Sequence, residues 1–345
     1  MQNGRNDRAG AVFVQTNEAK NRVLVFPRGK DGALEDPTAY ETGGAGSAMP
    51  HLTSQGSVIA SRDRRFLLVG NDASNQVSVF RVDGTRLDRV AVVDAGGEAP
   101  RSLTERDGIV YVLNTAKAGI ASFRLSDETA GPMVDAQTPL SAPDADPAQI
   151  GLSPDGRALV VTERGTDAIE VFPVREDGSL GEPTSFPSSG ETPYGFAFAS
   201  NGALVVTEAF GARSGAAAAS SYRLEAGSLR PVSRSLANGM SEICWAVVTP
   251  DDRYAFTTNF GESTVSRFAV ASDGALTLED AAAAEIGERR KGLRDEDLSD
   301  DGRFLYAIDA DGGAVVGWRI GDDGSLTPVG SRDGLPTTIA GLAAV

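Results

Sequence analysis

One pattern recurs seven times along this chain, and an internal repeat constrains a fold more strongly than any other feature of a sequence. Each copy has an apolar run that ends in a polar residue, a short polar loop, and a second apolar run that ends in an aromatic residue. The polar residues serve as anchors, and their mean spacing is about 49 residues. The anchors are Asn17, Asn71, Asn114, Glu163, Glu208, Asn259 and Asp309.

Three further columns keep the same register. An aromatic residue stands nine positions after six of the anchors, and in the fifth copy Tyr222 follows by 14, because residues 211–220 insert five positions there. An Asp-Gly pair follows four anchors by 14 positions, and SPDGR or a variant of it precedes four. The aromatic column consists of Phe26, Phe80, Phe123, Phe172, Tyr222, Phe268 and Trp318. Four columns in register predict one structural unit that is built seven times.

The fourth copy indicates what that unit is. Residues 148–153 and 158–163 are apolar runs of strand length, joined by a turn that contains Asp155. The runs 168–174 and 179–186 follow, with an Asp-Gly turn between them. Asp-Gly between strand-like runs is a strong hairpin signal, because glycine adopts positive φ freely. Four antiparallel strands of about 49 residues are typical of one β-propeller blade. The sequence therefore predicts an all-β, seven-bladed propeller.

The two ends of the chain predict how the ring closes. The chain begins with a second strand at 11–17 and ends with 339–345, which has the character of a first strand without a partner. We expect the C-terminal strand to complete the N-terminal blade, since this removes an open sheet edge. The prediction is a single domain over 11–345, preceded by a disordered tail at 1–10.

Charge and composition exclude several classes of partner. The net charge is −16, so no basic face exists to bind nucleic acid or an anionic membrane. The single cysteine, Cys244, cannot form an intrachain disulfide. No apolar run is long enough to span a membrane, and the first residues lack the apolar core of a signal peptide. We expect a cytoplasmic monomer, although a chain whose leader had been removed would look the same.

A ligand site is predicted at one mouth of the central channel. In a blade of this kind the first strand begins, and the second strand ends, at the same mouth. Arg101 and Arg294 precede or begin inner strands, and Glu208 ends a second strand, so we take these three as candidate catalytic residues. The arginines would hold a carboxylate or phosphate, and the glutamate would act as acid or base. Candidate ligand-binding residues at the same mouth are Gln55, Gln149, Glu163, Tyr194, Trp245 and Asp309.

A purely structural interpretation of these residues stays open. Asn and Asp anchors commonly cap strand ends by bonding nearby amides, and the arginines could simply pair with acids. A lone histidine such as His51 could act as a general base, but it has no evident partner in the sequence, which favours a surface position. Cys244 begins an inner strand, where a buried and inert thiol is usual. Neither a His/Cys cluster nor a glycine-rich phosphate loop is present, so we expect no metal and no cofactor.

The SPDGR motif, the strand–Asn–strand–Phe pattern and the Asp-Gly-x-Leu turn resemble the seven-bladed lactonase family, over about residues 10–345. This family includes bacterial 6-phosphogluconolactonases and fungal carboxymuconate-lactonizing enzymes. Glu208 is similar to a family glutamate, and Arg101 after its proline is similar to a family Pro-Arg motif. Residues 146–149 lack the family's histidine, and Tyr194 lies within Pro-Tyr-Gly where the family has Arg-His.

The resemblance implies a hydrolase or isomerase that acts on a small acidic lactone, of the sugar-acid or muconolactone type, at the channel mouth. The departures from the family pattern leave a second hypothesis open. This is a catalytically silent propeller that binds a small molecule, or that binds another protein.

Overall fold

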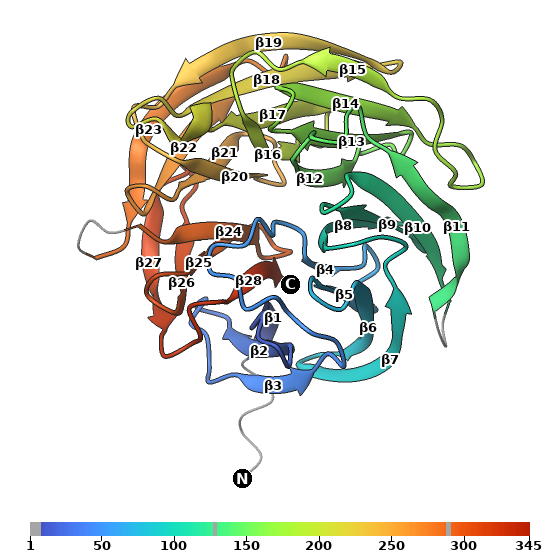
Figure 1. Cartoon of the computed structure of the whole chain (residues 1–345). Helices are drawn as coiled ribbons and strands as arrows, with labels where there is room; N and C mark the ends of the chain where they lie inside the picture. Colours follow the sequence, from blue (N-terminus) through green and yellow to red (C-terminus); the bar gives the residue numbers. More distant parts are fainter. Residues whose placement is uncertain (1–7, 127–129, 288–290) are drawn as a thin grey trace.

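The computed structural model describes residues 8–126, 130–287 and 291–345. They form seven four-stranded antiparallel sheets, arranged as blades around a central axis (Figure 1). The predicted fold class and the number of blades are therefore confirmed. Within the described ranges, no helix is long or apolar enough to cross a membrane.

Four strands follow one another from the inner to the outer edge of each blade. The first blade comprises β28 (Ala340–Ala344), β1 (Arg8–Gln15), β2 (Arg22–Gly29) and β3 (Thr38–Glu41). The second comprises β4 (Val58–Ala60), β5 (Phe66–Asn71), β6 (Gln76–Asp83) and β7 (Arg86–Asp94). The third comprises β8 (Pro100–Arg106), β9 (Ile109–Asn114), β10 (Gly119–Leu125) and β11 (Ala130–Pro139). The fourth comprises β12 (Pro147–Leu152), β13 (Ala158–Glu163), β14 (Ala168–Pro173) and β15 (Thr184–Pro187).

The remaining blades keep the same order. The fifth comprises β16 (Pro193–Phe198), β17 (Ala203–Glu208), β18 (Ala218–Glu225) and β19 (Ser228–Ala237), with a 3₁₀ turn at Phe210–Ala212. The sixth comprises β20 (Ile243–Val248), β21 (Tyr254–Asn259), β22 (Thr264–Val270) and β23 (Leu276–Glu285). The seventh comprises β24 (Leu293–Leu298), β25 (Phe304–Asp309), β26 (Ala314–Ile320) and β27 (Leu326–Arg332).

The ring closes through the C-terminal strand, as predicted. Strand β28 pairs with β1 in the first blade, where Val12 lies opposite Ala344. Strand β1 begins at Arg8, so residues 8–10 of the expected tail are part of the sheet. The rest of that tail, 1–7, lies outside the described residues.

The repeat columns have clear structural roles. Six of the seven anchors are the last residue of the second strand of their blade, and Asn17 lies two residues beyond β1. Every member of the aromatic column is buried on a third strand. Neighbouring blades pack through these rings, as where Phe26 joins Phe304 and Tyr306 in one apolar cluster. Burial of such a side chain contributes about 1.5–3 kcal/mol, so the column stabilises the stacking of the blades.

A β-bulge recurs where the inner strands begin. In the third blade Pro100 pairs with the anchor Asn114, but Ser102 pairs with Leu113, so Arg101 is the extra residue. Similar irregularities occur at the starts of β12, β16, β20 and β24. The residue before β8, β12, β16 and β20 has a positive φ, between 46° and 60°. A bulge re-aims a side chain, so it decides which residues reach the channel mouth.

Candidate active site

A cavity of about 360 Å³ lies at the mouth where the inner strands begin. Its walls come from the starts of β16, β20 and β24, from loops that follow second strands, and from the segment between β3 and β4. In Figure 1 that last segment, drawn in blue, reaches the middle of the ring. The lining residues are His51, Arg164, Thr192, Tyr194, Ala209, Gly211, Ala212, Glu242, Ile243, Cys244, Phe260 and Arg294.

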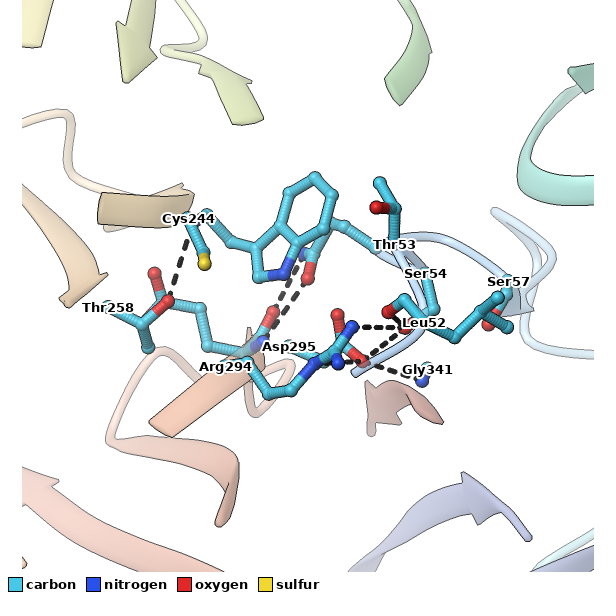
Figure 2. A network of polar contacts seen from close by, with 12 residues as sticks. Leu52, Thr53, Ser54, Ser57, Cys244, Thr258, Arg294, Asp295 and Gly341 are labelled. Atoms are coloured by element: carbon cyan, nitrogen blue, oxygen red, sulfur yellow. Dashed lines mark hydrogen bonds and ion pairs between the residues drawn. The ribbon is translucent and has the colours of Figure 1, made fainter. Parts of the chain in front are cut away.

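Arg294 is the buried cation of this cavity. Its side chain is 4% exposed, and its Nη2 donates a hydrogen bond to Ser54 Oγ at 3.1 Å (Figure 2). Its Nε lies 3.6 Å from Asp295 Oδ2, but makes no hydrogen bond within the described residues. The same Asp295 oxygen accepts bonds from Ser54 Oγ at 2.6 Å and from Gly341 N at 2.8 Å. Because Arg294 makes no direct hydrogen bond to Asp295, its guanidinium keeps an N–H donor that can bind a carboxylate or phosphate.

His51 and Asp311 form a hydrogen-bonded pair at the rim. His51 Nε2 lies 2.6 Å from Asp311 Oδ1, and the two side chains are 46% and 39% exposed. The imidazole also packs edge-on against Phe260, with ring centroids 4.8 Å apart. The other ring nitrogen has no hydrogen bond among the residues that the structure describes. An imidazole oriented by a carboxylate, with one free nitrogen at a cavity, is the arrangement of a general base.

Sequence reasoning missed the partner of His51. The histidine is at the surface, as expected, yet it also lines the cavity and has a carboxylate neighbour. Asp311 follows the anchor Asp309 by two positions, and this position indicates that it lies near the same channel mouth. The pairing itself joins residues 260 positions apart, which no local pattern could predict.

An aromatic stack forms a second wall. Tyr194 packs against Trp245 with ring centroids 4.8 Å apart, and the Arg164 guanidinium lies 5.0 Å from the Tyr194 ring centroid. The Tyr194 hydroxyl lies 3.2 Å from Thr53 Oγ1. Burial raises the pKa of Tyr194, so its hydroxyl stays protonated at neutral pH and can donate a hydrogen bond. Arg164 is held by Asp146, 2.6 Å from its Nη2.

Cys244 lies in the apolar part of the wall, near Ile243 and Phe260. Its Sγ is 3.4 Å from the Glu242 carbonyl oxygen. Burial raises the pKa of the thiol to about 12, so the thiolate is scarcely populated at neutral pH. The thiol therefore acts as a small apolar surface here, not as a nucleophile.

Glu208, predicted as catalytic, lies at the end of β17 and is fully buried. Its carboxylate accepts hydrogen bonds from Gly190 N at 2.8 Å and from Ser220 Oγ at 2.5 Å. It does not line the cavity, although its neighbour Ala209 does. Burial raises the pKa of Glu208. Its catalytic role stays a prediction, and its contacts are those of a group that holds a loop.

Glu163 and Asp309 have a similar position. Glu163 accepts a hydrogen bond from Ser141 N at 3.1 Å, and Asp309 accepts one from Gly312 N at 2.9 Å. Both bonds tie a loop to the end of a second strand, as the structural interpretation of the anchors expects.

Arg101, the other predicted catalytic arginine, pairs with Asp72 at 2.7 Å and does not line the cavity. Gln55 and Gln149 each bond the backbone of another blade. Gln55 bonds Glu296 N and O, and Gln149 bonds Phe196 N and O. These side chains join blades at the inner edge of the ring.

Bulges account for two of the residues that reach the cavity. In the fifth and sixth blades the pairing becomes irregular after Pro193 and Ile243, and the next residues, Tyr194 and Cys244, line the cavity. In the seventh blade Arg294 pairs regularly with Ile308 and lines the cavity from just before the bulge, which falls at Asp295. Gln149 and Trp245 lie one position further on and project between blades. Counting one residue from the pairing position would have found Cys244 in place of Trp245.

The fold and this cavity define a closed seven-bladed propeller with a cavity at its channel mouth that a buried arginine lines. The family described as "Lactonase, 7-bladed beta-propeller" matches residues 7–145 and 133–210, which together span more than half of the chain. The chain belongs to this family.

Individual relatives agree with that assignment. A 6-phosphogluconolactonase of Serratia proteamaculans (strain 568) is 26% identical over 213 residues, which cover 58% of this chain and 61% of that protein. The chain thus spans about three fifths of the length of this relative.

Solved structures show the likeness of fold. A candidate 6-phosphogluconolactonase of Bacteroides fragilis has a TM-score of 0.76 at 17% identity, over 99% of each chain. The Pseudomonas aeruginosa periplasmic gluconolactonase PpgL has a TM-score of 0.74 at 19% identity, over 96% of this chain and 98% of that one.

Proposed function

We propose that this protein hydrolyses a small acidic lactone in the cavity at the channel mouth. One observation carries the proposal. The same cavity of 360 Å³ is lined by His51, whose imidazole is oriented by Asp311, and by the buried cation Arg294. The pair supplies a base, and the cation supplies a site for the acidic group of the substrate.

The chemistry follows from these positions. The free ring nitrogen of His51 takes a proton from a water molecule as the water oxygen attacks the lactone carbonyl carbon. Asp311 stabilises the imidazolium that forms. The tetrahedral intermediate then breaks the bond between the carbonyl carbon and the ring oxygen, and the imidazolium returns the proton to that oxygen. The product is the open hydroxy acid, and water is the only co-reactant.

Two donors serve the substrate oxygens. Arg294 is pre-positioned by Ser54 and Asp295, so little ordering is required when it binds a carboxylate or phosphate. The protonated hydroxyl of Tyr194 is the second donor, and it can bond a substrate oxygen in place of Thr53 Oγ1. The activities named for the relatives, 6-phosphogluconolactonase and gluconolactonase, are lactone hydrolyses and support this reaction class.

The test measures hydrolysis of a panel of sugar and aryl lactones. The acid that hydrolysis releases is monitored by the colour change of a pH indicator. We expect turnover by the native protein, and a fall in kcat of about 100-fold or more in His51→Gln and in Asp311→Asn. Both residues are at the rim, so thermal unfolding should change little. Arg86→Gln, on the outer strand β7, is the matched control and should keep native rates.

Two results would contradict the proposal. The first is the absence of hydrolysis of any lactone by the native protein, which would favour a propeller that binds without turnover. The second is an unchanged kcat in both rim variants.

A further inference from the structure

We infer that the cavity selects a ligand with an apolar ring body and a single carboxylate, in preference to a polyhydroxylated or phosphorylated sugar lactone. The inference rests on the proposed function and narrows its substrate class. It depends on three features of the cavity: its apolar walls, its few free hydrogen-bonding side chains, and its single incompletely paired cation.

The apolar surface comes from two sources. One side is formed by Ile243 and Cys244, at the start of β20, and by Phe260, which follows the last residue of β21. Ala209 and Ala212 form the other, and they belong to the loop after β17, where the fifth repeat carries its insertion. A segment that breaks the repeat therefore supplies a wall of the site, and this wall presents methyl groups.

The inserted loop is held in an unusual conformation at this wall. Phe210, Gly211 and Ala212 are consecutive residues with positive φ, of 47°, 60° and 61°. Non-glycine residues disfavour this region, so the packing around the loop must hold it in this conformation. The turn places Gly211 and Ala212 against the cavity, so this part of the wall carries no large or polar side chain.

The polar side chains of the cavity are few and mostly engaged. Asn, Gln, Ser and Asp, the usual partners of sugar hydroxyls, are absent from the described lining residues. Thr192 Oγ1 accepts a bond from Gly211 N, and the Tyr194 hydroxyl contacts Thr53. Lys291 Nζ bonds Glu242. A hydroxyl that is buried without a partner loses its bonds to water, so several hydroxyls would weaken binding here.

The charges fit one carboxylate. Arg164 is paired with Asp146, whereas Arg294 shares its acid with two other donors. The planar guanidinium matches a carboxylate in a two-point contact. The carboxylate of Glu242 also lines the cavity but is paired with Lys291. Among the described lining residues, Arg294 is the one arginine without a direct hydrogen bond to a carboxylate, so the second charge of a phosphate would lack a partner.

The experiment compares four lactones under one assay: dihydrocoumarin, its 4-carboxylate, glucono-1,5-lactone and the 6-phosphate of the last. We expect kcat/KM for the carboxylated aryl lactone to exceed that for either sugar lactone by about tenfold or more. Thermal shift with phenylacetate, and with gluconate at the same concentration, measures binding without turnover. Phenylacetate should raise Tm, and gluconate should not.

A matched pair of variants tests the wall. Ala212→Asn adds an amide at the rim in a conformation that Asn tolerates, so folding should be kept. We expect it to lower the preference for the carboxylated aryl lactone over glucono-1,5-lactone by about threefold or more. Ala226→Asn makes the same change at a positive φ of 48° in the turn between β18 and β19, outside the cavity, and should leave the preference unchanged.

The outcomes separate the two proposals. Faster hydrolysis of a sugar lactone, or equal rates for all four, overturns the inference and leaves lactone hydrolysis standing. Stabilisation by phenylacetate alone, without hydrolysis of any lactone, overturns the proposed function and supports the ligand class. The absence of both hydrolysis and stabilisation overturns both.

Discussion

Carboxylates at this channel mouth have contrasting surroundings, and the surroundings decide what each can do. Asp311 is partly exposed and faces an imidazole, so it can orient a base. Glu208 is buried under a loop, and its Oε1 accepts hydrogen bonds from Gly190 N and the Ser220 hydroxyl. Asp311 and Glu208 both lie at or just after the end of a second strand, yet they differ in role. Only Asp311 contacts a residue that lines the cavity, His51.

Glu208→Gln separates these roles. The loop contacts predict that lactone hydrolysis in this variant stays within about twofold of native, since no cavity group is removed. The free energy of unfolding in urea should change by less than about 1 kcal/mol, because the bonds from Ser188, Gly190 and Ser220 all go to Oε1, which the amide oxygen of glutamine can replace. A loss of activity of about 100-fold without loss of stability would instead establish Glu208 as the acid or base that the sequence predicts.

At the scale of the element, the C-terminal strand is the piece on which the ring depends. Strand β28 pairs with β1, and two acids of β24 accept its amides: Asp295 bonds Gly341 N at 2.8 Å and Asp297 bonds Ala344 N at 3.0 Å. The strand thus links the first and seventh blades. Gly341 has a φ of 64°, and a Cβ there would lie 2.1 Å from Ser57 Oγ, so only glycine fits.

Deletion of residues 337–345 should leave the protein largely insoluble, because it exposes the edge of β1 and the apolar faces of two blades. Soluble yield and circular dichroism measure the effect. A synthetic peptide of the deleted sequence, present during refolding, should restore solubility by adding the missing strand. A soluble truncated protein with an unchanged cooperative melt would contradict this role for β28.

At the scale of the whole molecule, buried acids and a net charge of −16 act in the same direction on stability. Burial, with the nearby charge of Glu163, raises the pKa of Glu170 from 4.5 to about 7. Burial also raises the pKa of Asp297 from 3.8 to about 6. The unfolded chain ionises these groups at lower pH than the folded protein, so their stabilising contribution is full below about pH 4 and is lost as pH rises to about 7.

The free energy of unfolding should therefore fall between pH 5 and pH 8. Glu170→Gln should remove about 1–3 kcal/mol of this fall and should stabilise the protein at pH 8 more than at pH 5. Urea unfolding at pH 5 and pH 8 measures the free energy of unfolding of each variant. The control is Glu176→Gln, which lies in an exposed turn of the same blade. A fall in stability that Glu170→Gln leaves unchanged would show that this carboxyl is not its source.

The number of blades, the closure of the ring and the packing role of the aromatic column could all be predicted from the amino-acid sequence. The reason is that turn chemistry and apolar patterning act over short distances. Asp177 and Gly178 form their turn from contacts within a few residues, and Phe172 is buried wherever its strand is covered by a neighbouring blade. Because the pattern occurs seven times, an irregularity in one copy does not obscure the repeat.

Only the tertiary structure decided which side chains meet at the mouth. Cys244 lines the cavity while Trp245 packs against Tyr194, because the bulge at the start of β20 shifts the alternation of the side chains there by one residue. His51 meets Asp311 across 260 positions, because the segment between the first two blades reaches the middle of the ring. A periodic sequence encodes a repeated structural element. Contacts between residues outside the repeat pattern, such as His51 and Asp311, form only when the blades are arranged in a closed ring.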